Sequence, residues 1–194
     1  GSARSLFVNV PATLVIAQRN PALNWGFQTV PQAHLNGRRI PIPRGRGLGG
    51  CALINGMVYF RGHPRDFDDW AREGAQGWSY REVLPYFRRS EHNENFGDSV
   101  YHGRGGPMTV RQVTRPNPLN AAFFAALGEL GVPARSDLNG ADSEGMALRQ
   151  LAIRGGTRVT TANALLRPAM SRPNLTVLTG AQATRVLMEG KSAM

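Results

Sequence analysis

Cysteine, lysine and long hydrophobic runs are almost absent from this sequence. Cys51 is the only cysteine among 194 residues, so the chain can form no internal disulfide, which is compatible with a reducing compartment. The most apolar run, residues 6–17, contains Asn9 and Pro11 and is far shorter than the ~20 residues that span a bilayer. No stretch has the pattern of a secretory signal peptide. We therefore expect no transmembrane segment.

Negative charge is also scarce, with 13 Asp and Glu against 23 Lys and Arg and a formal net charge of +10. The alternative function that this charge suggests is a basic nucleic-acid-binding module, and Arg44-Gly45-Arg46-Gly47 superficially resembles an RGG tract. However, the arginines are scattered from Arg4 to Arg185, with no long basic run and no interleaved aromatic residues. We therefore predict a basic surface and no nucleic-acid partner.

The composition is otherwise that of an ordinary folded protein. Hydrophobic residues make up 41% of the chain, and 194 residues suffice for one large domain or two small ones. The residue patterns predict a mixed α/β (α+β) fold with long irregular connections. Five prolines within residues 1–43 predict an extended segment there, because proline interrupts helices.

Local patterns predict the individual helices and strands. Ser79 and Glu82 have the spacing of a capping box, which would begin a helix ending at Arg89. Apolar residues at helical spacing predict a helix over 117–130, ended by Gly131. Further predicted elements are a short helix at 53–60, a helix at 161–170 that begins at Thr160 or Thr161, and strands at 108–113, 146–153, 175–178 and 183–188.

The stretch from Arg44 to Asp68 carries the strongest chemical signal. Glycines occupy positions 45, 47, 49 and 50, where they let the backbone turn sharply and approach a ligand without a Cβ in the way. The small residues Cys51 and Ala52 follow, and a helix that begins with small residues offers free N–H groups to a phosphate or another anion. The stretch is a candidate cofactor-contact loop, and a glycine-rich surface loop is the alternative.

This stretch resembles the first signature of the glucose–methanol–choline (GMC) flavoprotein oxidoreductases. The resemblance rests on Gly45-Arg46-Gly47-Leu48-Gly49-Gly50, on Leu53-Ile54-Asn55, and on Tyr59, Gly62 and Asp68. It extends over nearly the whole chain, and Asn24-Trp25-Gly26-Phe27 and Gly77-Trp78-Ser79-Tyr80 are similar to choline dehydrogenase-like bacterial members.

The resemblance implies an FAD cofactor and a set of residues that contact it. The residues implied at the flavin, its ribityl chain or its phosphate arm are Leu48, Gly49, Cys51, Asn55, Gly56 and Val58. Val186 would contact the adenine through its backbone.

Two neighbouring positions, Cys51 and Ala52, depart from the family signature, and a third, Ile54, bears on how FAD would be attached. Ile54 stands where some members carry a histidine bonded covalently to FAD, so we expect non-covalent binding. Cys51 and Ala52 stand where the signature has Gly, Ser or Thr, and they lack the hydrogen bonds that a hydroxyl would offer to the cofactor.

The resemblance also implies a division into two incomplete domains. Residues 1–78 and 171–194 would belong to an FAD-binding domain, and residues 79–170 to a sheet-based substrate-binding domain. The complete enzyme would oxidise a primary alcohol to an aldehyde by hydride transfer to the flavin, and would then pass electrons to an acceptor. We expect it in the cytoplasm, either free or peripheral to the inner membrane.

The catalytic histidine of the family and its GxGxxG pyrophosphate loop have no counterpart in this sequence. His34-Leu35-Asn36 imitates the histidine motif, but a surface turn at Asn36-Gly37 accounts for it. We therefore assign no catalytic residue and no metal site, and expect an internal fragment of the enzyme that is inactive by itself. A non-catalytic scaffold domain that retained this fold is a further alternative.

Overall fold

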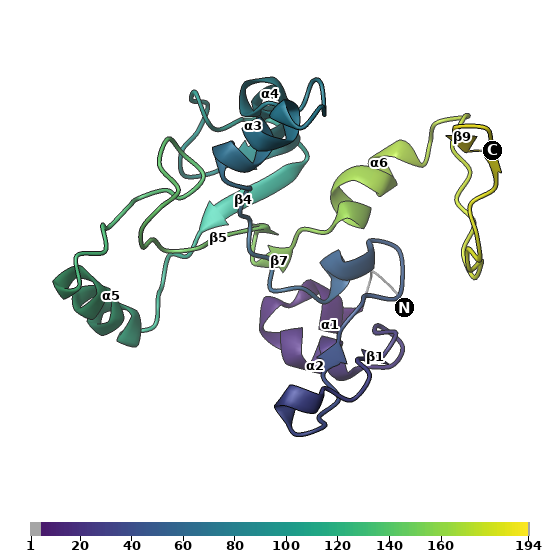
Figure 1. Ribbon diagram of the computed structural model, residues 1–194, viewed down its shortest axis with the longest axis horizontal. Helices are drawn as coiled ribbons and strands as arrows, with labels where there is room; N and C mark the ends of the chain where they lie inside the picture. Colours follow the sequence, from purple (N-terminus) through teal and green to yellow (C-terminus); the bar gives the residue numbers. More distant parts are fainter. Residues whose placement is uncertain (1–4, 194) are drawn as a thin grey trace.

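The computed structural model describes residues 5–193, which form a mixed α/β fold of many short elements, as expected (Figure 1). The helical elements are α1 (Leu6–Asn9), η1 (Pro11–Thr13), α2 (Leu14–Arg19), η2 (Ala33–Leu35), η3 (Gly50–Leu53), α3 (Pro64–Arg72), α4 (Tyr80–Ser90), α5 (Leu119–Glu129), η4 (Ala162–Leu166) and α6 (Arg167–Ala169). The strands are β1 (Phe27–Gln28), β2 (Pro41–Ile42), β3 (Glu91–Asn93), β4 (Met108–Gln112), β5 (Gln150–Leu151), β6 (Ile153–Arg154), β7 (Thr157–Arg158), β8 (Met188–Glu189) and β9 (Ser192–Ala193).

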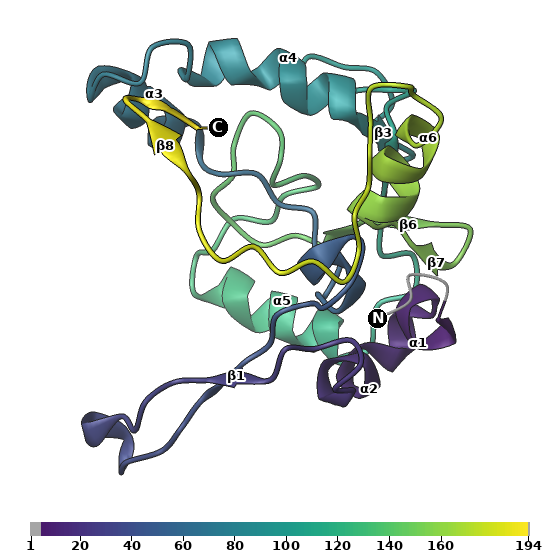
Figure 2. The same cartoon turned by 90° about the vertical axis from the view of Figure 1, so that its right-hand side faces the viewer.

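The first part of the chain forms short helices where its prolines predicted an extended segment. Pro11 begins η1, a position where its missing N–H is not needed and its fixed φ suits the helix, so it starts a helical turn instead of breaking one. The extended form begins only after α2, where β1 and β2 pair antiparallel in an arm that projects from the body (Figure 2). The helices contribute to a small buried core of Val8, Ala17, Leu23, Leu53 and Ile54.

The predicted helix at residues 53–60 is wrong. The helical turn η3 lies earlier in the sequence and begins at Gly50. Gly49 and Gly50 adopt positive φ angles of 102° and 53°, which turn the chain into it. Met57 then has a φ of 58°, which a continuous helix does not allow, and the chain beyond it is extended. Val58 forms an antiparallel bridge with Leu151. Pairing with a segment far along the sequence therefore overrides the local apolar pattern.

Helices α3 and α4 pack together through aromatic side chains. Ser79 and Glu82 form the predicted capping box at the start of α4, and an equivalent box at His63 begins α3. The ring of Phe67 lies between the two helices, and its centroid is 5.3 to 6.0 Å from those of Trp70, Tyr80 and Phe87. These contacts hold the two helices together.

The main sheet has three strands in the order β3-β4-β5. Strand β3 pairs parallel with β4, and β5 pairs antiparallel with β4 on its other side. The predicted strand at 108–113 is confirmed as β4, whereas the one at 146–153 forms only over its last residues, in β5 and the first residue of β6. The β6–β7 hairpin continues the chain. It leads to the predicted helix at 161–170, present as the π-helical η4 followed by α6.

Helix α5 confirms the helix predicted over 117–130, and Gly131 at a φ of 79° ends it. The helix lies at the end of two extended connections, apart from the sheet (Figure 1). Leu119, Phe123 and Leu130 are largely exposed. The apolar pattern thus predicted the helix correctly, although no residue of α5 is buried within the described part of the chain.

The two strands predicted at 175–178 and 183–188 are absent from the described residues. Only β8 and β9 form in this region, a short hairpin in which Met188 pairs with Ala193. A strand requires a hydrogen-bonded neighbour, and no described segment pairs with residues 175–187. The prediction was wrong because an alternating pattern cannot by itself supply that neighbour. Between the two predicted ranges, Gly180 has a positive φ of 71°.

A cluster of buried polar residues joins the start of α3 to the sheet. We call Arg61, Glu91, Asn93, His102, Asp137 and Gln150 the buried polar cluster. Arg61 Nη2 lies 2.8 Å from Glu91 Oε2. The ring nitrogens of His102 lie 3.1 Å from Glu91 Oε1 and 2.7 Å from Asp137 Oδ2. Buried charges are tolerated only when paired in this way, so the cluster fixes how these segments pack.

Burial alone would lower the pKa of His102, but the hydrogen bonds with Asp137 and Glu91 outweigh it and raise the pKa to about 9. The imidazolium form of His102 therefore makes its full contribution to stability at pH values below 6.5, the ordinary pKa of histidine. This contribution is lost as the pH rises through 9. We expect the free energy of unfolding to fall by up to about 3 kcal/mol over this range, measured by urea denaturation at a series of pH values.

His102→Gln should remove most of this pH dependence, because glutamine does not titrate. His34→Gln, at an exposed position, is the matched control and should keep it. Equal pH profiles for the parent chain and His102→Gln would show that this imidazolium does not stabilise the fold.

Candidate functional site

The glycine turn, residues 45–50, folds back tightly on itself, so that the backbone of Gly50 packs against Gly45. A Cβ at Gly45 would lie 2.0 Å from the carbonyl oxygen of Gly50, so only glycine can occupy that position without a shift of backbone. The N–H groups of Leu48 and Gly49 donate to no other residue among 5–193. Unpaired N–H groups at the start of a helical turn suit an anionic or polar ligand.

The C-terminal segment completes a pocket at this turn. The pocket has a volume of about 690 Å³ and lies between two parts of the chain that are far apart in sequence. One wall consists of Trp25, Arg46, Gly47 and Leu48, and the other of residues 178–182. The guanidinium carbon of Arg46 lies 4.9 Å from the centre of the Trp25 ring, which holds a positive charge at the mouth of the pocket.

The buried guanidinium of Arg158 holds the segment that follows the turn. Its Nη1 donates to the carbonyl oxygen of Asn55 at 2.6 Å and to Asn55 Oδ1 at 2.9 Å. Its Nε donates to the carbonyl oxygen of Val8 at 2.9 Å. Burial lowers the pKa of this guanidinium, although a group with so high an ordinary pKa stays charged at neutral pH. Arg158 thus connects β7, the segment after the glycine turn and α1.

Asn55 uses the two atoms of its side-chain amide for different purposes. Its Oδ1 accepts from Arg158 and from the N–H of Met57, the latter at 3.0 Å. Its Nδ2 donates to no other residue among 5–193, and the residue is exposed. The donor is therefore the part of this side chain that is open to a ligand.

The structure brings most of the predicted cofactor residues onto one continuous segment, residues 48–58. Cys51 is exposed, and the N–H of Gly45 lies 3.5 Å from its Sγ. Val58 is 48% exposed and lies beyond the strained Met57, on the strand-like part of this segment. Of the predicted contacts, only Leu48 lines the pocket at the glycine turn. Val186 is 71% exposed and lies outside the segment 48–58, on the C-terminal part of the chain.

Sequence reasoning missed Arg158 and His102, which hold the site and its surroundings in place. Arg158 is one of many arginines and has no motif of its own, and His102 contacts Asp137 across a loop of irregular length. Each role becomes apparent only from the hydrogen bonds that the residue makes with distant parts of the sequence.

The described residues contain no group of three or more His, Cys, Asp or Glu that could hold a metal ion. None of their helices has the length and apolar character needed to cross a membrane.

The chain belongs to the GMC oxidoreductase family, whose model matches residues 4–194. The family depends on FAD. This agrees with the signature identified at residues 45–68.

Similar proteins of known name cover the whole of this chain. It is 42% identical over 187 residues to an oxygen-dependent choline dehydrogenase of Brucella anthropi, a match that covers 96% of this chain and 34% of that protein. It is 43% identical over 196 residues to the enzyme of the same name from Photobacterium profundum, covering 100% of this chain and 34% of that protein. The chain thus spans about a third of the length of these relatives.

Solved structures show the same fold. The pyridoxine 4-oxidase from Mesorbium loti matches 97% of this chain and 37% of its own, with a TM-score of 0.88 and 34% identity. An FAD-dependent oxidoreductase from Chaetomium thermophilum matches 99% of this chain and 34% of its own, with a TM-score of 0.83 and 29% identity.

Replacing Arg158 tests its role in holding the site. Arg158→Met removes the donor of hydrogen bonds to buried carbonyl groups, and we expect it to lower the free energy of unfolding by about 3 kcal/mol. Arg154→Met, a change at an exposed position on the same hairpin, should cost less than about 0.5 kcal/mol. Urea denaturation followed by circular dichroism measures both. Equal unfolding midpoints for the two variants would contradict the role assigned to Arg158.

Proposed function

We propose that this chain is part of an FAD-dependent alcohol oxidoreductase similar to choline dehydrogenase, which oxidises a primary alcohol to an aldehyde. The observation that carries the proposal is the glycine turn, whose Leu48 and Gly49 N–H groups are open and whose backbone excludes side chains at Gly45. The names of the relatives from Brucella anthropi and Photobacterium profundum support an alcohol substrate and an electron acceptor as partners.

We further propose that the chain contributes to two domains. Residues 1–78 and 171–194, of which the structure describes 5–78 and 171–193, would form part of the FAD-binding domain. The pocket shared by the glycine turn and residues 178–182 supports this assignment. Residues 79–170 would form part of the substrate-binding domain, and the sheet β3-β4-β5 within this range supports it.

The residues of the glycine turn fit an FAD cofactor, and each would have a distinct role. The N–H groups of Leu48 and Gly49 would donate to its polar atoms, and Cys51 would pack beside it. FAD, when bound, supplies the acceptor for the hydride that leaves the alcohol carbon. Asn55 would donate from Nδ2, held in that orientation by Arg158.

Gly56, Val58 and Val186 complete the proposed set of contacts. Gly56 and Val58 would lie along the flavin and its ribityl chain, and Val58 is kept in place by its bridge to Leu151. Val186 would contact the adenine. Ile54 is buried and has no group that could bond covalently to the flavin, which supports non-covalent binding.

The purified 194-residue chain should not oxidise choline or simple alcohols, because it contains no counterpart of the histidine base or of the pyrophosphate loop of the family. Any FAD that it binds should be released by acid precipitation. Reduction of an artificial dye by the chain with added FAD and choline measures the activity. Turnover that depends on flavin, or a precipitate that stays yellow, would contradict this expectation.

Asn55→Asp separates the two roles of the Asn55 amide in a full-length protein that contains this chain. Aspartate keeps an oxygen for Arg158 and Met57 but removes the Nδ2 donor. We expect FAD to bind about five- to 150-fold more weakly, the effect of one lost buried hydrogen bond.

The control is His34→Ala, at an exposed position outside the site, which should leave FAD affinity unchanged. Fluorescence titration with FAD measures all three proteins, and urea denaturation verifies that Asn55→Asp remains folded. Equal FAD affinities would remove Asn55 from the cofactor site.

A further inference from the structure

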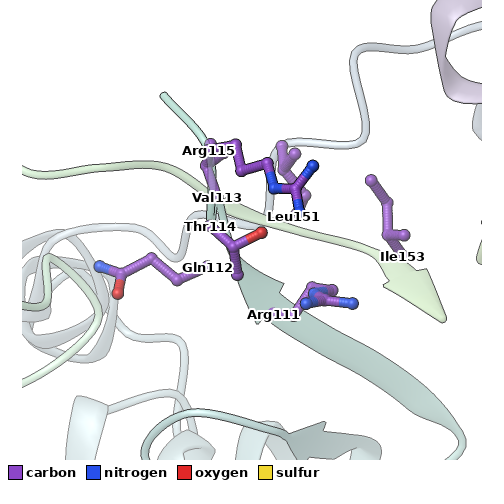
Figure 3. Close-up of a pocket in the computed structure, with 7 residues that line it drawn as sticks. All are labelled: Arg111, Gln112, Val113, Thr114, Arg115, Leu151 and Ile153. Atoms are coloured by element: carbon purple, nitrogen blue, oxygen red, sulfur yellow. The ribbon is translucent and has the colours of Figure 1, made fainter. Parts of the chain in front are cut away.

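A pocket bordered by two arginines opens on the sheet where β4 meets β5 (Figure 3). It has a volume of about 280 Å³. Arg111 and Arg115 supply its polar wall, and Leu151 and Ile153 supply an apolar one. The side chains of all four lie around the same opening in Figure 3. The pocket therefore combines positive charge with an apolar surface.

The register of the strands puts this pocket on the same face of the sheet as Val58. Arg111 pairs directly with Leu151, and Leu151 forms a bridge with Val58. Directly paired residues project to the same face, so these three side chains form a row across the sheet. Ile153 follows Leu151 by two positions and shares that face. Since neighbouring strands lie ~4.8 Å apart, the backbones of Val58 and Arg111 are separated by about 10 Å.

The opposite face of the same strands is closed. Gln150, which alternates with Leu151, is buried and donates from Nε2 to Asp137 Oδ1 at 2.7 Å. Ala152 is buried as well and packs with Val159 and Ala164. A molecule that lies along the row from Val58 to Arg111 therefore has only one face of the sheet available to it.

The charges of the two arginines are only partly compensated. Arg115 makes no ion pair or side-chain hydrogen bond with another residue among 5–193. Arg111 forms one long, half-exposed ion pair with Glu94, whose Oε2 lies 3.7 Å from the Nε, too far for a hydrogen bond. No Asp or Glu lines the pocket. Two guanidinium groups at one opening, one unpaired and one in a long ion pair, suit a carboxylate or phosphate, which arginine can bind through paired hydrogen bonds.

We propose that this pocket binds an anionic end of the substrate, so that the alcohol oxidised carries a carboxylate or phosphate group. This inference rests on the proposed function, because it needs Val58 to lie beside the flavin. The hydroxyl end of the substrate would lie near Val58 and its charged end between Arg111 and Arg115, with Leu151 against its carbon chain. Choline is disfavoured, because its quaternary ammonium would face two positive charges.

Substrate selectivity in the full-length, FAD-loaded protein that contains this chain tests the proposal. The substrates are γ-hydroxybutyrate, its neutral amide and choline, assayed with a dye acceptor. We expect the highest kcat/KM for the carboxylate. Arg111→Met and Arg115→Met should each lower that value by about 10- to 100-fold, mainly through KM, and should lower the ratio of carboxylate to amide kcat/KM by a similar factor.

Arg104→Met is the matched control, because it removes one arginine charge from an exposed loop outside the pocket and should alter no kcat/KM value. Equal or greater kcat/KM for choline, or an unchanged preference in both pocket variants, overturns this inference while the proposed function stands. A full-length protein that binds no FAD overturns the proposed function and this inference with it.

Butyrate, which cannot be oxidised, provides a readout without turnover. Isothermal titration calorimetry with the FAD-loaded protein should detect butyrate binding that Arg111→Met abolishes and Arg104→Met leaves unchanged. If none of the three alcohols is oxidised, this measurement decides: butyrate binding that depends on Arg111 supports the pocket, and its absence overturns the inference.

Discussion

The segment after the glycine turn is held from a part of the chain about a hundred residues later. Arg158 donates to the main chain and side chain of Asn55, and the N–H of Ala152 donates to the carbonyl of Met57. These contacts help to maintain the left-handed conformation of Met57, which is unfavourable for a residue with a side chain. Because the proposed cofactor contacts lie on this segment, their geometry depends on the strands that return to it.

Elements with local signals could be predicted from the sequence. The capping box at Ser79 fixes the start of α4, and Gly131 fixes the end of α5, because each signal acts within one turn of its own helix. Strand β4 follows from its alternation and is bounded by a glycine-rich loop. The glycine turn could be predicted in the same way, since glycine spacing is a property of the local sequence and carries the resemblance to the family.

The remaining features depend on partners that a local pattern does not specify. Residues 53–60 have the composition of a helix, but Val58 pairs with Leu151, and that pairing determines the conformation. Residues 175–187 have the alternation of strands but no neighbour in the described part of the chain. The ionic contacts of His102 join residues from three separate segments. A histidine with an ordinary pKa and one with a pKa of about 9 look the same in a sequence.

The hydrogen bond from Arg158 to the carbonyl of Val8 also affects how the chain folds as it is synthesised. The two residues are 150 positions apart, so α1 emerges from the ribosome long before its partner exists. Until then Val8 lacks its hydrogen bond with Arg158, although its core neighbours Leu23, Leu53 and Ile54 already exist, and the entropy of closing so long a loop has still to be overcome. Such high contact order slows folding. The N-terminal helices are therefore expected to reach their final packing late, and their apolar side chains are candidates for chaperone binding during translation.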